Sequence, residues 1–280
     1  MIKYLVLSDQ DKELLVKLHD FVYLDSDFIV EYVLTKYYGK PAVMHRLRTL
    51  EDAGYIKSFT VPIEFATKPV NVYTLTTFGV EIVEQIQGIV KWNRHWTTKL
   101  APWYQHQLML NRIVAWYQRE ADNYDLEVKD WIPESRATWQ YTKNKPDVIK
   151  PDGLMIIGPK GSKDNLGLFI ELERSIAKRQ NTVQKVIRYN DFLIRGQELL
   201  EDYDIHVGFE APVTDWRVLF IGGNAPNTIK TIRDILSVEE KEKYKLSIPV
   251  LVASRGDIEQ DPFGAIYHYV LDEPEVKKEL

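Results

Sequence analysis

Residues 150–174, KPDGLMIIGPKGSKDNLGLFIELER, decide how the second part of this sequence folds. The apolar stretches 148–157 and 166–172 are strand-like, and residues 158–165 between them favour a hairpin loop because they contain glycine, proline and serine. A long helix is expected over residues 176–194, where apolar residues recur at helical spacing. Further strands are expected at 126–131, 218–221 and 250–253. Alternating strands and helices predict an α/β domain with a mixed sheet.

Three carboxylates lie on the predicted hairpin. Asp152 follows Pro151 on the first strand, and Glu171 and Glu173 stand two residues apart on the second. Residues two apart on a strand face the same side, so both glutamates are expected to point where Asp152 points. Converging carboxylate oxygens suit Mg²⁺ or Mn²⁺, which need few protein ligands. The sequence therefore predicts a divalent metal site with Asp152 and Glu171 as ligands.

A structural alternative stays open for the same residues. Asp152 and Gly153 are also typical of a plain turn. Ion pairs within a folded sheet imitate catalytic clusters, and this sequence offers nearby cations for such pairs: Arg174, Lys178, Lys185 and Arg188.

The first part of the chain has a different pattern. Ser8 is expected to cap a first helix, and a second helix starts near Asp25 or Ser26. Pro41 suits the first turn of a third helix, which ends at Gly54. Strands are expected at 55–61 and 70–75, followed by a fourth helix from Thr76. Three helices, a two-stranded wing and a closing helix make a winged helix-turn-helix, which we expect to form a DNA-binding domain over residues 1–95. The second domain is then expected over residues 96–280.

Residues 46–56 and 73–79 closely resemble the winged-helix family. In that family the third helix enters the major groove and the wing contacts the DNA backbone. The resemblance implies double-stranded DNA as partner, with Lys40, His45, Arg46 and Arg48 as contacts and Lys57 near the wing. The alternative is that these charges are solvated or serve a protein contact, because fold alone does not fix function.

Composition limits the classes of protein to consider. The 280 residues suggest two domains, and the net charge of −5 means that any DNA contact is a local patch. The chain has no cysteine, which excludes disulfides, thiolate zinc sites and a cysteine nucleophile. No apolar run approaches the ~20 residues that span a bilayer, so a cytoplasmic protein without membrane contact is expected.

Pro151-Asp152 on one strand and Glu171-x-Glu173 on the next resemble the PD-(D/E)XK nuclease superfamily. The resemblance implies a restriction-endonuclease-like second domain whose catalytic residues are Asp152, Glu171 and Glu173. Glu173 stands at the superfamily's usual lysine position, so Lys185 on the following helix is the expected replacement cation. Glu134 is the expected additional acid. The implied cofactor is Mg²⁺ or Mn²⁺, and the implied fold class is α+β.

The whole chain also resembles the replication-relaxation family of plasmids and mobile elements. The matching stretches occur in the family's order at 106–111, 131–134, 151–153, 169–174 and 185–189. The resemblance implies sequence-directed DNA binding in replication or DNA relaxation, with replication or mobilisation proteins and a homodimer as expected partners. Two other functions stay open: an active Mg²⁺-dependent endonuclease, and a transcriptional regulator with a non-catalytic second domain.

Overall fold

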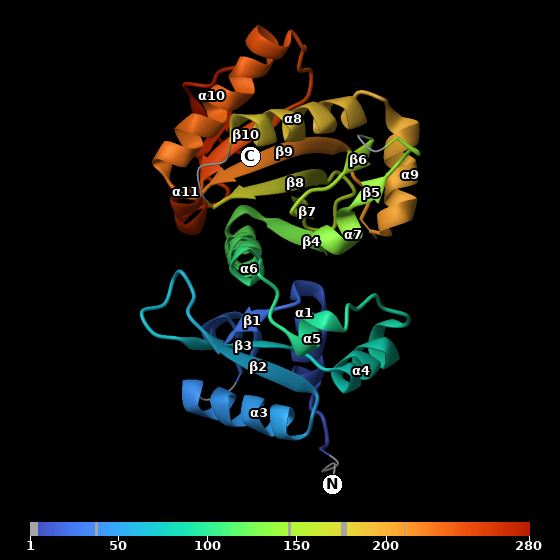
Figure 1. Ribbon diagram of the computed structural model, residues 1–280, viewed down its shortest axis with the longest axis vertical. Coiled ribbons are helices and arrows are strands. Elements are labelled where there is room, and N and C mark those ends of the chain that lie inside the picture. The colour runs from blue at the N-terminus through green and yellow to red at the C-terminus, as the bar shows by residue number, and fades with distance from the viewer. Residues whose placement is uncertain (1–4, 37–38, 145–146, 175–177, 210) are drawn as a thin grey trace. The chain divides into compact units, whose positions relative to one another are not determined.

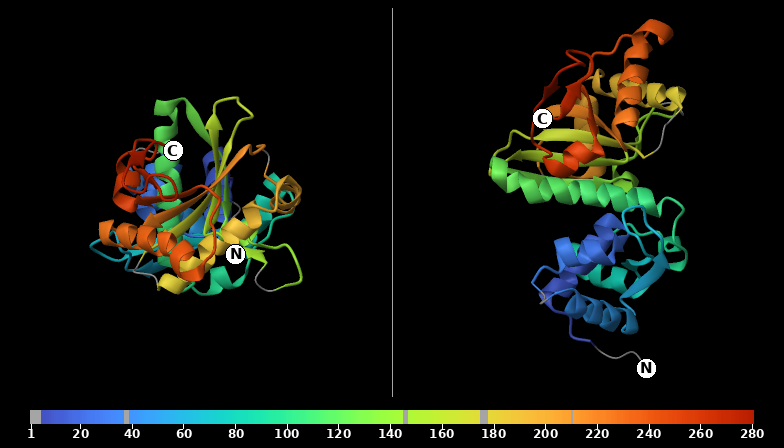
Figure 2. Two further views of the ribbon diagram at one scale, coloured as in Figure 1. Left: turned by 90° about the horizontal axis from the view of Figure 1, so that it is seen from above. Right: turned by 90° about the vertical axis from the view of Figure 1, so that its left-hand side faces the viewer.

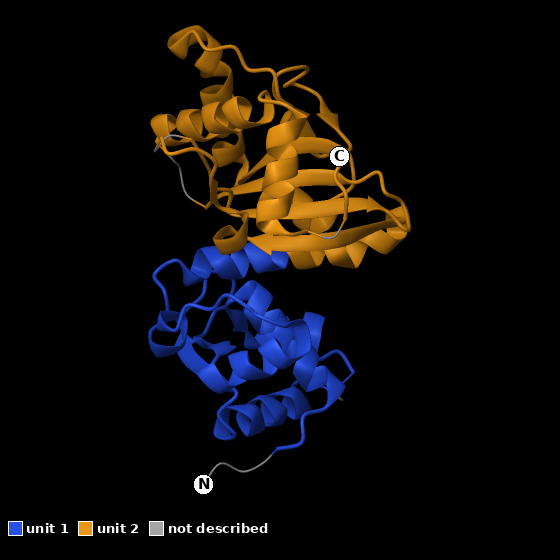
Figure 3. Cartoon of the chain, turned by 90° about the vertical axis from the view of Figure 1, so that its right-hand side faces the viewer, with its two compact units in different colours: residues 1–112 blue, residues 113–280 orange. Residues whose placement is uncertain are grey.

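The computed structural model describes residues 5–36, 39–144, 147–174, 178–209 and 211–280. The chain divides into two compact units, unit 1 over Met1–Arg112 and unit 2 over Ile113–Leu280 (Figure 3). The predicted α+β class and large mixed sheet are confirmed. None of the described helices combines the length and the apolar character that a membrane crossing needs.

Unit 1 opens with helices. The start of α1 (Asp9–Phe21) is fixed by a capping box, in which Ser8 and Asp11 each accept the other's backbone N–H. The chain continues through β1 (Leu24–Asp25), α2 (Ser26–Phe28) and the π-helical turn η1 (Ile29–Val33). Pro41 lies in the first turn of α3 (Lys40–Asp52), and Gly54 follows the helix with a φ of +82°, which favours glycine.

A hairpin and a closing helix follow α3. β2 (Ile56–Val61) and β3 (Val70–Leu75) pair antiparallel, and β1 adds to the other edge of β3. The Thr76 hydroxyl caps α4 (Thr77–Gln87), which packs against α1, and the short α5 (His95–Thr98) comes next. The third helix, the hairpin and the closing helix therefore occur where the sequence predicts them.

The division between the units falls within α6 (Tyr104–Glu120), one uninterrupted helix (Figure 2, right). It comes later than residue 95 because the first half of α6 bonds to the turn after α1. The Asn111 amide donates to the carbonyl oxygens of Phe21 and Tyr23, and Arg112 donates to both carboxylate oxygens of Asp25.

Unit 2 is built on a seven-stranded sheet with the order β12-β11-β10-β9-β8-β7-β4. Its middle pairs β8–β9 and β9–β10 are parallel and its outer pairs are antiparallel, so the sheet is mixed. The strands are β4 (Leu126–Pro133), β7 (Gly153–Pro159), β8 (Leu166–Glu173), β9 (Asp215–Gly222), β10 (Val250–Ser254), β11 (Tyr267–Tyr269) and β12 (Lys277–Lys278).

Helices α8 (Arg179–Leu193) and α10 (Ala225–Glu242) cover one face of this sheet (Figure 1). Side chains from both helices form one buried cluster with alternate strand residues such as Phe169, Phe220 and Val252. The expected start of α8 at residue 176 lies outside the described residues. The smaller elements of the unit are η2 (Ala121–Tyr124), α7 (Glu134–Ala137), β5 (Trp139–Gln140), β6 (Val148–Ile149), α9 (Gln197–Val207) and α11 (Arg255–Gln260).

One predicted strand is wrong. Residues 148–157 do not form a single strand: β6 pairs with β5 in a separate two-stranded sheet, and β7 begins only at Gly153. Pro151 lies at the break, where it has no N–H to donate to a neighbouring strand. The break leaves Asp152 at the entry to β7.

Candidate active site

Asp152 is anchored to the neighbouring strand β8 through both its backbone and its side chain. Its N–H donates to the carbonyl oxygen of Ile170 at 3.0 Å, and its carboxylate Oδ2 accepts the N–H of Leu172 at 2.7 Å. Both bonds flank Glu171 on β8. The next residue must be small, because a Cβ on Gly153 would lie 2.0 Å from a ring carbon of Trp131.

Glu171 and Glu173 lie on the face of β8 that α8 covers. Glu171 is 1% exposed and Glu173 is 9% exposed, although β8 is otherwise apolar over most of its length. Phe169, two residues before Glu171, contacts the ring of Tyr189 on α8 with centroids 5.3 Å apart. The period of two therefore turns all three side chains toward that helix.

Lys185 and Tyr189, which lie one helical turn apart on α8, contact the two carboxylates. Lys185 Nζ is 2.7 Å from Glu171 Oε2 and donates to Glu173 Oε1 at 3.0 Å. The Tyr189 hydroxyl donates to Glu171 Oε1 at 2.6 Å. The structure thus brings Lys185, Glu171 and Glu173 together, with Asp152 anchored beside them.

The pKa values of the groups in this cluster depend on one another. Burial, followed by the charge of Asp152, raises the pKa of Glu171 to about 8, while Lys185 and Tyr189 act to lower it. Burial acts to lower the pKa of Lys185, but the carboxylates of Glu171, Asp152 and Glu173 outweigh it and raise that pKa. Burial, then the charge of Glu171, raises the pKa of Tyr189 well above its ordinary value. Ionisation of Glu171 is therefore favoured by the ammonium and the phenol and opposed by its other surroundings.

Tyr189 was not among the residues that the sequence predicted for this site. A signal was present, since Tyr189 follows Lys185 by four residues and shares its helix face. Two other side chains lie apart from the cluster. Glu134, the expected additional acid, pairs with Lys150 at 3.1 Å with both side chains about half exposed, and the charge of Arg188 acts on Tyr141.

Asp152, Glu171 and Glu173 offer oxygen donors of the kind that a divalent cation binds. All of their ligand atoms are carboxylate oxygens, and Glu171 Oε2 is buried without an aligned hydrogen bond. Within the described ranges, no group of three or more histidine, cysteine or acidic residues is placed to hold a metal ion. Carboxylate oxygens suit Mg²⁺, which is often bound by one or two carboxylates and water.

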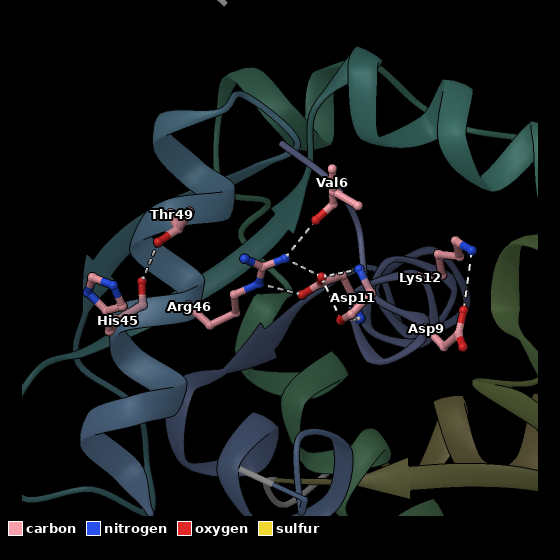
Figure 4. A network of polar contacts seen from close by, with 8 residues as sticks. Val6, Asp9, Asp11, Lys12, His45, Arg46 and Thr49 are labelled. Atoms are coloured by element: carbon pink, nitrogen blue, oxygen red, sulfur yellow. Dashed lines mark hydrogen bonds and ion pairs between the residues drawn. The ribbon is translucent and has the colours of Figure 1, made fainter. Parts of the chain in front are cut away.

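Arg46 on α3 is held inside unit 1 (Figure 4). Its Nε donates to Asp11 Oδ1 at 2.8 Å, a second nitrogen bonds Asp11 Oδ2, and the same nitrogen donates to the carbonyl oxygen of Val6. Asp11 is fully buried, so this pair fastens α3 to α1. The Arg46 guanidinium is therefore engaged within unit 1, and its DNA contact stays a prediction.

The other predicted DNA contacts differ in their surroundings. His45 and Arg48 are exposed on α3. Lys40 pairs with Asp27, both being exposed, and Lys57 lies over the ring of Phe59 at 5.1 Å from its centroid. Of the five residues, Lys40, His45 and Arg48 are exposed, whereas Arg46 and Lys57 are partly buried.

A family model with the description Replication-relaxation matches residues 26–202, more than half of the chain. The chain belongs to the Replication-relaxation family. The match begins at α2 and extends through the acidic cluster into α9, so it includes Asp152, Glu171, Glu173 and Lys185. Family membership, predicted from the order of five short stretches, is confirmed.

No curated protein matches the chain. Among solved structures, restriction endonuclease FokI matches with 12% sequence identity and a TM-score of 0.32. The alignment covers 90% of this chain and 42% of FokI, so the chain spans less than half the length of that enzyme.

Proposed function

We propose that this protein binds double-stranded DNA through unit 1 and acts in the replication or DNA relaxation of a plasmid or other mobile element. Unit 1 would act as a winged helix, with α3 as recognition helix and the β2–β3 hairpin as wing. Replication or mobilisation proteins and a second copy of the chain are the protein partners that such a role involves. Membership of the Replication-relaxation family supports the role.

One observation carries the proposal: the open face of α3. Its exposed residues recur at helical spacing, at Pro41, His45, Arg48 and Asp52, while Val43, Leu47 and Leu50 are buried. A helix with such a face after a helical turn, followed by a hairpin, is suited to the major groove. His45 and Arg48 would contact DNA, and Lys40 and Lys57 would contact its backbone at the margins.

The test is DNA binding by Arg48→Ala and His45→Ala variants of the full chain. The probe is the DNA that flanks the gene, compared with random duplex across a range of salt concentrations. We expect Arg48→Ala to weaken binding and to reduce the salt slope by about one unit if the residue contacts a phosphate. Lys12→Ala is the matched control, because Lys12 is an exposed lysine on α1 that pairs with Asp9.

Unchanged affinity and slope in a folded Arg48→Ala, His45→Ala double variant would exclude α3 as the DNA-binding helix. The position of the footprint separates two roles. Protection of repeated sites supports a function in replication, whereas protection of a promoter supports a transcriptional regulator.

A second candidate function, metal-dependent cleavage of DNA, is favoured by the cluster of Asp152, Glu171, Glu173 and Lys185, in which the two glutamates are buried. Carboxylates would hold Mg²⁺ or Mn²⁺, which supplies Lewis-acid stabilisation of a scissile phosphate, and the lysine would stabilise negative charge there. This chemistry needs only the hard oxygen donors that the cluster contains.

Incubation of supercoiled plasmid with the protein and Mg²⁺ or Mn²⁺ tests this candidate. If it is correct, nicked or linear product forms, the cation raises the melting temperature, and Asp152→Asn abolishes both effects. Asp164→Asn, which changes an exposed acid in the β7–β8 hairpin loop, is the control. Absence of product together with an unchanged melting temperature would leave the cluster a structural one.

A further inference from the structure

The ammonium of Lys185 lies between two carboxylates that share one face of β8. It is 2.7 Å from Glu171 Oε2 and 3.0 Å from Glu173 Oε1, so it joins one oxygen of each. Mg²⁺ and Mn²⁺ bind carboxylate oxygens of this kind. The Lys185 ammonium and a divalent cation would therefore bind the same two atoms, Glu171 Oε2 and Glu173 Oε1.

We propose that Lys185 is an internal counter-ion, and that a divalent cation reaches Glu171 and Glu173 only in competition with its ammonium. This inference rests on the proposed use of a divalent cation. It assigns Lys185 a role that opposes metal binding, in contrast to a lysine that only assists the reaction.

The two oxygens of Glu171 are held differently, which supports the competition. Oε1 accepts the Tyr189 hydroxyl at 2.6 Å and is oriented by it. Oε2 is buried and has no aligned hydrogen bond, and its close neighbour is the Lys185 ammonium. A cation that replaced the ammonium at Oε2 would leave the Tyr189 bond intact.

The Lys185 ammonium is also able to move away from Glu171 and Glu173 into water. Its side chain is 31% exposed, whereas the side chains of Glu171 and Glu173 are 1% and 11% exposed. A lysine ammonium sits on a flexible four-carbon stem, so it can turn to water without moving α8. Charge favours the exchange, because Asp152, Glu171 and Glu173 when ionised carry three negative charges against the single positive charge of Lys185.

The test compares Mn²⁺ and Mg²⁺ affinity, measured by calorimetry on the full chain, between the natural protein and Lys185→Met. Methionine keeps much of the length of the stem and removes the ammonium. We expect roughly tenfold tighter cation binding, equivalent to about 1.4 kcal/mol. Lys178→Met, which removes an exposed lysine at the N-cap of the same helix, should leave the affinity unchanged.

A second measurement uses the natural protein, so it does not depend on the folding of the variant. The rate of acylation of Lys185 by an amine-reactive reagent, followed by mass spectrometry, should rise several-fold when Mg²⁺ replaces Na⁺ at equal ionic strength. Lys178 serves as the internal reference.

The outcomes separate the counter-ion role of Lys185 from the proposed use of a divalent cation. Tighter binding by Lys185→Met, or faster acylation of Lys185 with Mg²⁺, supports the inference. Equal or weaker binding by a folded Lys185→Met, or unchanged acylation while the natural protein binds the cation, overturns the inference and leaves the proposed cation use standing. Absence of binding by every folded variant overturns both.

Discussion

Arg46 and Asp11 illustrate how a single buried charge determines the position of a helix. Asp11 caps α1 through Ser8 and also receives the guanidinium of Arg46 from α3. Removing one partner of a buried pair leaves the other charge without compensation, which typically costs 3–5 kcal/mol, more than most exposed ion pairs contribute. We therefore expect this contact to matter for folding rather than for DNA.

Arg46→Met should lower the free energy of unfolding by about 3 kcal/mol. The folded fraction should keep the natural salt slope of DNA binding, because the Arg46 guanidinium is already bonded to Asp11 and Val6. Arg48→Met is the matched comparison on the same helix and should give the reverse: little change in stability and a smaller salt slope. Urea denaturation and binding at several salt concentrations measure both. A full loss of slope in stably folded Arg46→Met would contradict this assignment.

The same pair predicts a dependence on pH. Burial acts to raise the pKa of Asp11, but hydrogen bonds from Arg46 and Ser8 outweigh it, and the pKa lies below its ordinary value of 3.8. A lowered pKa means that the ionised form stabilises the fold above 3.8 and that this contribution is lost as the pH falls through the folded-state value. Asp11→Asn should therefore be less stable than the natural protein at pH 7, with the difference shrinking below pH 3.8. A difference independent of pH from 7 to 2 would refute this origin.

Helix α6 shows how one element completes a unit that precedes it in the chain. Gln107 donates to Asn111, and Asn111 in turn donates to the carbonyl oxygens of Phe21 and Tyr23 in the turn after α1. Arg112 pairs with Asp25 and lies over the ring of Phe65, 4.2 Å from its centroid. These bonds give hydrogen-bond partners to buried polar groups that water does not reach.

Asn111→Leu should lower the stability of unit 1 by about 1–3 kcal/mol, because the carbonyl oxygen of Tyr23 would lose the Asn111 amide and that of Phe21 would keep only the Tyr23 N–H. Asn123→Leu, at an exposed position after α6, should change stability by less than about 0.5 kcal/mol. Chemical denaturation of both variants, with the circular dichroism signal as readout, compares them. Equal effects would mean that the α6 contacts contribute nothing to unit 1.

The elements differ in how far the sequence predicts them. The hairpin and the shared face of Glu171 and Glu173 follow from a period of two, which is local information. The contacts of Lys185 and Tyr189 need the docking of α8 on the sheet, which periodicity does not specify. Arg46 had a usable signal, because it lies three residues after Val43 and four before Leu50, on the buried side of α3. Its partner, Asp11, is 35 residues away in sequence and was not predictable locally.

At the scale of the whole molecule, the family match ends before the sheet of unit 2 is complete. Residue 202 lies inside α9, and four of the seven strands of the sheet, β9 to β12, come after it. β9 pairs in parallel with all of β8, from Leu166 to Glu173, so the strand that carries the two glutamates depends on residues beyond the match. Residues 203–280 are thus part of the structural support of the acidic cluster.

The acidic cluster is divided between a hairpin and a helix that is made later on the ribosome. When β7 and β8 have left the ribosome, Asp152, Glu171 and Glu173 are already present, whereas the ammonium of Lys185 on α8 has not yet been synthesised. Without a cation nearby, ionised carboxylates gathered at one place repel one another, and Lys185 on α8 supplies the opposite charge. The docking of α8 on the sheet therefore supplies the positive charge that offsets the repulsion among these carboxylates.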